Sequence, residues 1–145
     1  MRIRDVMTPR VEVIHPEATI EEAARKMKSL DVGPIPVCDG DRLVGMLTDR
    51  DITVRATAEG KDPKQTRVRE VMTEDVLYCF EDDDVRTAAD SMAQAQVRRL
   101  VVLNREKRLV GIVALGDLAV EPGAQEEAAD ALEEISEPAQ PARSR

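Results

Sequence analysis

The chain of 145 residues has very few aromatic side chains: one tyrosine, one phenylalanine and no tryptophan. Proteins that bind single-stranded nucleic acids stack bases on several aromatic rings, so this composition argues against that class. A core without large rings must be packed from aliphatic side chains, which is typical of sheets covered by helices. At this length we expect one compact domain, since the chain is too short for two independent cores.

The chain also lacks an excess of positive charge. Its formal net charge is −8, and much of this comes from the acidic segment after Val120. A duplex-binding protein needs a basic surface, so we expect no nucleic-acid partner. The first ten residues, MRIRDVMTPR, contain no apolar run of a signal peptide, and no later run is long enough to span a bilayer. We therefore expect a cytoplasmic protein without a membrane partner.

Metal ligands and catalytic motifs are scarce. His15 is the only histidine, and Cys38 and Cys79 do not have a metal-binding spacing, so we expect no metal site. The cysteines are either two buried free thiols or one disulfide, and a disulfide would require an oxidising compartment. The sequence contains no GxSxG, P-loop or GxGxxG motif and no nucleophile–base pair, which argues against an enzyme.

The sequence does contain a twofold internal repeat. RIRDVMTPRVEVI (2–14) aligns with RVREVMTEDVLYC (67–79) at an offset of 65 residues. GMLTDRDI (45–52) aligns with GIVALGDL (111–118) at an offset of 66, because the second copy has a longer turn before RLVG. A duplication tolerates an insertion in a turn, so both copies should have the same element order.

Each copy predicts the order strand, helix, strand, strand, helix. The first copy has a strand at 11–14, a helix capped by Thr19, strands PIPVC (34–38) and RLVGMLT (42–48), and a helix from Asp49 to about Glu59. The second has a strand at 76–80, a helix capped by Asp84, strands at 99–103 and 108–114, and a helix at 115–120. One such copy is too small to bury its sheet alone, so we expect the two to pack sheet to sheet.

The repeat sets the expected domain boundaries. The copies span about 2–60 and 67–120, are joined by a linker at 61–66, and together form one α/β (α+β) domain over 1–120. The remaining 121–145 is an acidic tail. Its first part, AQEEAADALEEIS (124–136), has helical spacing, whereas EPAQPARSR (137–145) is proline-rich and expected to be disordered.

The chain shows a tandem order of a VMT motif, a strand, a helix, a P-V motif and a G-h-h-T-x-x-D motif, in which h is an apolar residue. This order resembles a pair of cystathionine-β-synthase (CBS) domains, which is called a Bateman module. The resemblance covers Arg2 to about Val120, and LTDRDI followed by A-x-G-x-D-P is similar to stand-alone actinobacterial hypoxic-response or stress-type CBS proteins. It implies two β-α-β-β-α repeats packed about a pseudo-twofold axis. It also implies a homodimer that regulates an unknown partner protein without catalysis of its own, and that binds AMP, ADP, ATP or S-adenosylmethionine between the repeats.

The resemblance further implies two nucleotide sites, each built from both copies. The primary site combines Met46, Thr48, Asp51, Thr73, Val76, Tyr78, Val97 and Arg98. The weaker second site combines Thr8, Val11, Val13, Val32, Gly33, Ile112 and Asp117, with Ala114 in place of Thr48. We expect the first to dominate, because Thr48 supplies a hydroxyl and Arg98 a cation for phosphate oxygens.

The motif residues also have structural interpretations. T-x-x-D is also the pattern of a capping box. In this interpretation Thr48 and Asp51 stabilise the start of their own helix and bind no ligand. Gly45 allows either a second backbone or a flat base to approach its strand. Arg98 is either a phosphate ligand or a solvated surface residue, and Tyr78 either stacks on a base or packs as a half-buried strand residue.

Further alternatives remain open. Arg50 and Arg55 are phosphate candidates or solvated helix residues. The apolar residues Ile52, Val54 and Ala56 predict a dimer surface. The alternative function is a nucleotide-independent structural or interaction protein active in stress, which would use a Cys38–Cys79 bridge or exposed thiols.

Overall fold

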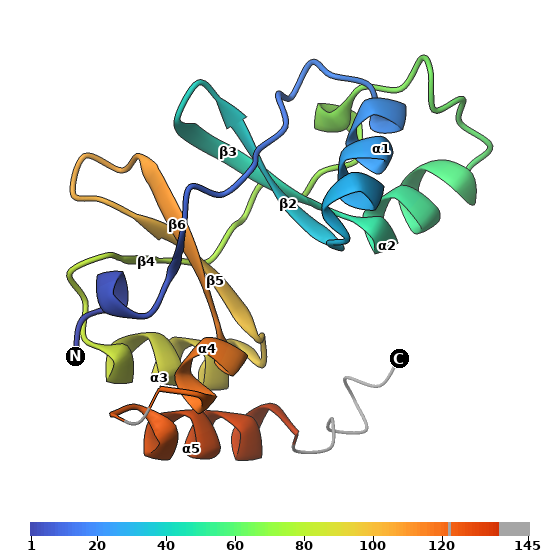
Figure 1. Ribbon diagram of the computed structural model, residues 1–145. Coiled ribbons are helices and arrows are strands. Elements are labelled where there is room, and N and C mark those ends of the chain that lie inside the picture. The colour runs from blue at the N-terminus through green and yellow to red at the C-terminus, as the bar shows by residue number, and fades with distance from the viewer. Residues whose placement is uncertain (122, 137–145) are drawn as a thin grey trace. The chain divides into compact units, whose positions relative to one another are not determined.

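The structure, a computed structural model, describes residues 1–121 and 123–136 (Figure 1). The predicted disorder at 137–145 lies outside the described residues. The chain divides into two compact units. Unit 1 contains Met1–Pro9, Tyr78–Asn104 and the chain from Val110 onward, and unit 2 contains Arg10–Leu77 and Arg105–Leu109. Each sequence copy therefore contributes its VMT segment to the unit formed mainly by the other copy.

Unit 1 is built on a four-stranded sheet in the order β1-β6-β5-β4. The strands are β1 (Thr8–Pro9), β4 (Tyr78–Phe80), β5 (Arg99–Leu103) and β6 (Leu109–Ala114). β1 pairs antiparallel with β6, and β4 pairs parallel with β5. The helices are α3 (Val85–Ala95), α4 (Leu115–Ala119) and α5 (Gln125–Ile135), and α5 runs against both α3 and α4 (Figure 1).

Unit 2 is built on the hairpin of β2 (Pro34–Asp39) and β3 (Arg42–Thr48), packed with α1 (Ile20–Leu30) and α2 (Asp49–Ile52). α2 continues as a π-helical turn at Thr53–Thr57. Two single bridges extend the hairpin, Ile14 parallel to Val37 and Met46 antiparallel to Thr73. The strand order of unit 1 is thus repeated, which confirms two β-α-β-β-α repeats.

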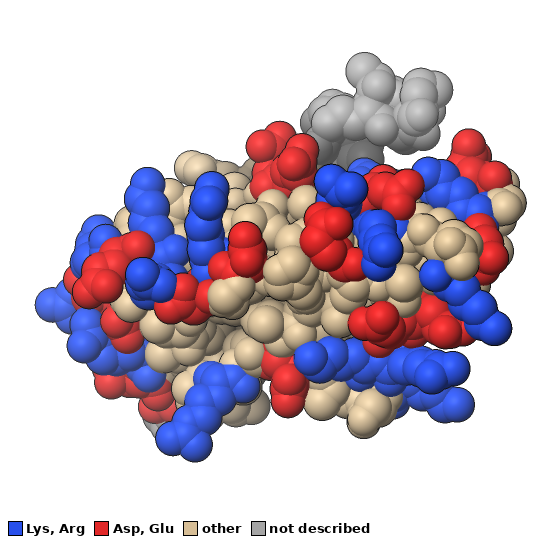
Figure 2. All heavy atoms as spheres, turned by 90° about the horizontal axis from the view of Figure 1, so that it is seen from above, with Lys and Arg blue, Asp and Glu red and all other residues tan. Residues whose placement is uncertain are grey.

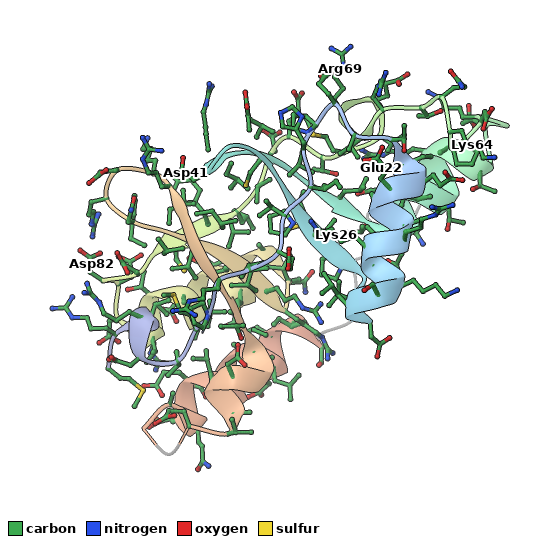
Figure 3. The ribbon with its side chains drawn as sticks, turned by 45° about the horizontal axis from the view of Figure 1, so that its top comes forward. Glu22, Lys26, Asp41, Lys64, Arg69 and Asp82 are labelled. Carbon is green, nitrogen blue, oxygen red and sulfur yellow. The ribbon has the colours of Figure 1, made fainter. Side chains whose placement is uncertain are left out.

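The predicted strand at 11–14 is reduced to the bridge at Ile14. A side chain takes the place of a ladder partner here, because Lys26 Nζ donates to the carbonyl of Val13 at 2.7 Å. Lys26 also lies 3.5 Å from the carboxylate of Glu12, and Figure 3 labels it between α1 and β2. In the second copy the strand begins at Tyr78, two residues later than expected.

Each unit has its own aliphatic core. Buried residues of unit 1 include Ile3, Met92, Leu100 and Leu118, and those of unit 2 include Ile20, Ile35, Leu47, Val68 and Val71. Ile3 and Val68 lie in short 3-10 helices just before the VMT motifs, at Ile3–Asp5 and Val68–Glu70, and both are fully buried. Each core is therefore completed by a side chain from the other sequence copy.

The predicted helix starts are confirmed. The Thr19 side chain accepts a hydrogen bond from the Glu22 N–H at 3.2 Å, and Asp84 accepts one from the Arg86 N–H at 2.9 Å. α3 buries Val85, Ala88, Ala89, Met92 and Ala93. In α1 the buried residues are Ile20, Ala23 and Met27, whereas Ala24 and Leu30 are exposed. Over the described part of the chain, no helix has the length and apolar character needed to cross a membrane.

Candidate functional site

The first candidate junction lies in unit 2, where β3 ends and α2 begins. The Asp51 N–H donates to Thr48 Oγ1 at 3.0 Å, and the Thr48 N–H donates to Asp51 Oδ2 at 3.0 Å. The two side chains thus form a complete capping box. A carboxylate has more acceptor positions than this cap uses, and the Asp51 side chain is 15 % exposed. Asp51 can therefore hold its helix and still accept hydrogen bonds from a ligand.

Arg55 is tied to its own unit. Its Nε lies 4.0 Å from Asp51 Oδ1, and its Nη1 donates to the carbonyls of Val71 and Met72, each at 3.1 Å. The guanidinium therefore joins the helical turn to the segment before Thr73. Arg50, the other phosphate candidate on this helix, is exposed.

The space beside Gly45 is filled by the backbone at Thr73, and not left open for the base of a ligand. Met46 and Thr73 exchange two backbone hydrogen bonds of 2.8 and 2.9 Å. A Cβ atom on Gly45 would lie 2.9 Å from the Thr73 carbonyl oxygen and 2.8 Å from Met72 Sδ. The structure thus brings Met46 and Thr73 of the predicted primary site into contact, beside Thr48 and Asp51.

The second junction lies in unit 1, where β6 ends and α4 begins. The Ala114 N–H donates to Asp117 Oδ2 at 2.8 Å, but alanine has no hydroxyl to return the bond. Ile112 pairs with Thr8, and a Cβ on Gly111 would lie 2.7 Å from the Thr8 carbonyl oxygen. The two junctions therefore share one backbone arrangement and one carboxylate, and they differ in the hydroxyl.

The charges beside the two junctions differ in sign. In unit 2 the Asp49 N–H donates to the Gly33 carbonyl at 3.1 Å, and the Asp49 carboxylate lies over Gly33. In unit 1 the equivalent bond runs from the Leu115 N–H to the Arg98 carbonyl at 2.9 Å. An arginine thus occupies the position of Gly33, and an apolar leucine that of Asp49. At these two positions unit 1 therefore offers a cation to an anionic ligand, whereas unit 2 offers a carboxylate.

A cavity of about 640 Å³ opens at the second junction, within unit 1. Arg98 and Arg99 line it together with Ala114, Gly116 and one side of α5. Both arginines are exposed, and no ion pair or side-chain hydrogen bond engages either of them among the residues that the structure describes. Arg98, which was predicted for the primary site, thus lines the same cavity of unit 1 as Ala114, which was predicted for the second site.

The remaining predicted residues divide between the units. Tyr78 is 42 % exposed and packs edge to face on Phe80, with ring centroids 5.6 Å apart. Val97 packs against the core of unit 1. Unit 2 holds the half-buried Val76, Val11, Val13 and Gly33 and the more exposed Val32.

The sequence indicated Arg99, beside Arg98, as a further guanidinium for phosphate oxygens, but it did not single out Asp49 or the cavity-lining side chains of α5. Asp49 had a local signal, because it is the chain neighbour of the predicted site residue Thr48. The α5 residues had none, because their place at the cavity depends on packing between distant segments.

Both cysteines are buried free thiols. Burial, and secondarily the negative charge of Asp41, raises the pKa of Cys38 to about 11. Burial and then Asp83 raise the pKa of Cys79 to about 12. Since the thiolate is the reactive form, neither thiol is activated near neutral pH.

Sequence comparison identifies the family. A sequence model of the CBS domain matches residues 3–56 and 68–122. CBS domain-containing protein YhcV of Bacillus subtilis is 47 % identical over 134 residues, covering 92 % of this chain and 94 % of that protein. Hypoxic response protein 1 of Mycobacterium tuberculosis is 38 % identical over 117 residues, covering 80 % of this chain and 81 % of that one.

Solved structures are similar as well. A CBS domain protein of Pyrobaculum aerophilum, PAE2072, complexed with AMP, has a TM-score of 0.76 at 27 % identity and covers 90 % of this chain and 99 % of its own. The CBS domain pair of protein MJ0100, in complex with 5′-methylthioadenosine and S-adenosylmethionine, has a TM-score of 0.71 at 28 % identity, with coverages of 82 % and 93 %.

Hypoxic Response Protein I has been solved with two coordinated zinc ions, and its structure matches with a TM-score of 0.74 at 37 % identity, covering 82 % of this chain and 97 % of that one. Within residues 1–121 and 123–136 of the present chain, no three His, Cys, Asp or Glu side chains gather as a metal site would require. The matched family and the repeated fold together show that this chain belongs to the CBS domain family, as a tandem pair of such domains.

Proposed function

We propose that the protein is a non-catalytic regulatory module that senses an adenine nucleotide or a related adenosyl compound. The observation that carries the proposal is the carboxylate at both junctions, Asp51 and Asp117, each with acceptor capacity beyond its backbone bond. Two carboxylate oxygens suit the two hydroxyls of a ribose. The AMP complex of the Pyrobaculum protein and the S-adenosylmethionine complex of MJ0100 support the same ligand class.

The proposal retains both sets of site residues that the resemblance predicts. These are the primary site, which includes Thr48 and Asp51, and the weaker second site, which includes Asp117. The prediction that the Asp51 site dominates used Arg98 as its phosphate anchor. Because Arg98 shares a cavity with Ala114 in its own unit, the charge argument for that ranking is weakened. The hydroxyl of Thr48 still favours the first site.

Calorimetric titration of AMP, ADP, ATP and S-adenosylmethionine tests the proposal. Asp51→Asn and Asp117→Asn are the suitable variants, because an amide oxygen can still accept the bond from the Thr48 or Ala114 N–H. A hydrogen bond to a charged group contributes about 1.5–3 kcal/mol, so loss of the ribose carboxylate should weaken binding about tenfold or more. Absence of binding to the unmodified protein by all four compounds would reject the proposal.

We also propose a cytoplasmic homodimer that transmits ligand occupancy to another protein. Three residues were expected at the dimer surface. The prediction for Ala56 is wrong, because this residue is fully buried in the core of unit 2. Ile52 packs partly against the same core, and Val54 is 47 % exposed. Figure 2 shows both acidic and basic side chains on the face that it draws. Sedimentation equilibrium at micromolar concentration tests the dimer.

A further inference from the structure

The cavity of about 640 Å³ at the second junction has a wall that the repeat alone does not supply. Arg98, Arg99 and the β6–α4 junction contribute part of the lining, and the helix α5 contributes the rest through Gln125, Ala128, Ala129 and Leu132. The lining thus combines two arginines with a mainly apolar helix side that carries one amide.

α5 is held on unit 1 by small side chains. Ala124, Ala128 and Ala131 are buried in the core of this unit, and Leu132 beside the cavity remains 44 % exposed. Among the polar links, Arg86 pairs with Asp130 at 3.3 Å, and Gln96 Nε2 donates to the Glu134 carbonyl at 3.2 Å. An alanine buries little apolar area, so this docking should be among the less stable parts of the unit.

Unit 2 differs at the positions that correspond to the two arginines and to α5. There the chain leaves the α2 helical turn at Thr57 and turns at Gly60. The positions of the two arginines are taken by Gly33 and Pro34, and the Asp49 carboxylate lies beside Gly33. Unit 1 therefore carries a pair of arginines where unit 2 carries Gly33 and Pro34.

We infer that the cavity binds the anionic part of a ligand through Arg98 and Arg99, and that α5 closes against the ligand, so that occupancy and docking of the tail helix are coupled. The ligand class is a phosphate-bearing compound with an apolar or flat body. Paired guanidinium groups bind phosphate oxygens, and the alanine face of α5 contacts the body. Coupling is reciprocal, so a ligand that prefers docked α5 must also stabilise its docking.

This inference deepens the proposed function and rests on it for the adenosine part of the ligand. Its signal would be a change in the tail helix α5, which lies entirely outside both matched repeats.

Hydrogen–deuterium exchange of the full chain tests the coupling, with AMP and inorganic pyrophosphate as separate probes. Either probe, when bound, should slow amide exchange within 125–135 several-fold, while exchange in the β2–β3 hairpin serves as the internal reference. Ala129→Glu should abolish this protection, because it places a carboxylate in the lining of the cavity that the two arginines also line. Ser136→Glu adds the same charge at the end of α5, at a residue that does not line the cavity, so it should leave the protection intact.

The double substitution of Arg98 and Arg99 by glutamine should weaken pyrophosphate binding about tenfold or more, whereas Arg25→Gln on α1 should not. Two failures are distinguishable. If no adenine compound binds but pyrophosphate protects α5, the proposed function fails and the cavity inference stands. If AMP binds without slowing exchange in α5, or if neither probe protects it, the inference is overturned.

Discussion

At the scale of single residues, the two strand glycines are explained by close backbone contact. A Cβ on Gly45 would lie less than 3.0 Å from Met72 Sδ and the Thr73 carbonyl oxygen, and a Cβ on Gly111 would meet Met7 and Thr8 in the same way. Both glycines therefore serve the approach of a VMT segment. This contact, more than a ligand, accounts for the glycine in each RLVG sequence.

Gly45→Ala should lower the free energy of unfolding by about 1–3 kcal/mol, because a methyl group must displace a backbone carbonyl. Gly116→Ala is the matched control. Nothing lies within 4 Å of a Cβ there, and alanine favours a helix by up to ~1 kcal/mol. Urea denaturation should thus move the two midpoints in different directions, and an equal loss in both variants would contradict the explanation.

The thiols give a second prediction at this scale. The pKa of Cys38 rises from an ordinary value of 9.0 to about 11, and that of Cys79 to about 12. Both folded values exceed the unfolded one, so the associated stability is fully present below pH 9 and is lost as the pH rises through about 11 and 12.

Iodoacetamide at pH 8 should therefore modify the folded protein slowly and the urea-unfolded protein fast, as measured by mass spectrometry. The urea-unfolded sample controls for reagent quality. Rapid modification of both thiols in the folded state would instead favour the alternative of a thiol-dependent stress protein.

At the scale of elements, the two strand–helix junctions differ by one hydroxyl. Thr48 and Asp51 cap α2 reciprocally, whereas at α4 only the bond from the Ala114 N–H to Asp117 exists. The helix starts are otherwise alike, with extended backbone at both Thr48 and Ala114. The repeat therefore contains an internal comparison of a full cap and half a cap.

Thr48→Ala should destabilise the protein by about 0.5–2 kcal/mol, and Ala114→Thr should stabilise it by a similar or smaller amount. Thermal unfolding of both variants and of the unmodified protein provides the measurement. Thr48→Ser, which keeps the hydroxyl, should remain close to the unmodified protein. A stability loss in Ala114→Thr would show that the second junction does not accept the cap.

At the scale of the whole molecule, the boundaries of the compact units differ from those of the sequence copies, because each unit contains a short segment of the other copy. Val68 and Val71, which belong to the second copy, are buried in the core of unit 2, and Ile3 of the first copy is buried in unit 1. The linker at 61–66 thus separates the two sequence copies, whereas the compact units meet after Pro9 and after Leu77, beyond each VMT segment.

A fragment of residues 10–77 contains every buried residue of the unit 2 core, whereas a fragment of residues 1–60 lacks Val68 and Val71. We expect the first fragment to show more helical circular dichroism and a more cooperative thermal transition. The two fragments are similar in length, so size is controlled. Equal or better folding of 1–60 would mean that the exchanged segment contributes little.

The sequence by itself determined the elements of this protein and their repetition. Thr19 and Asp84 cap the predicted helices, and the strands PIPVC and RLVGMLT form the expected hairpin, because caps, turns and alternating apolar residues act over a few neighbouring positions. Asp51 and Asp117 were identifiable as junction carboxylates for the same reason.

Only the tertiary structure decided what these elements contact. It placed a backbone against Gly45, buried Ala56, reduced the strand at 11–14 to one bridge, and set α5 beside Arg98. Each of these outcomes depends on partners far away in the chain. Local periodicity shows that a face is apolar, but which distant segment covers that face is decided by packing.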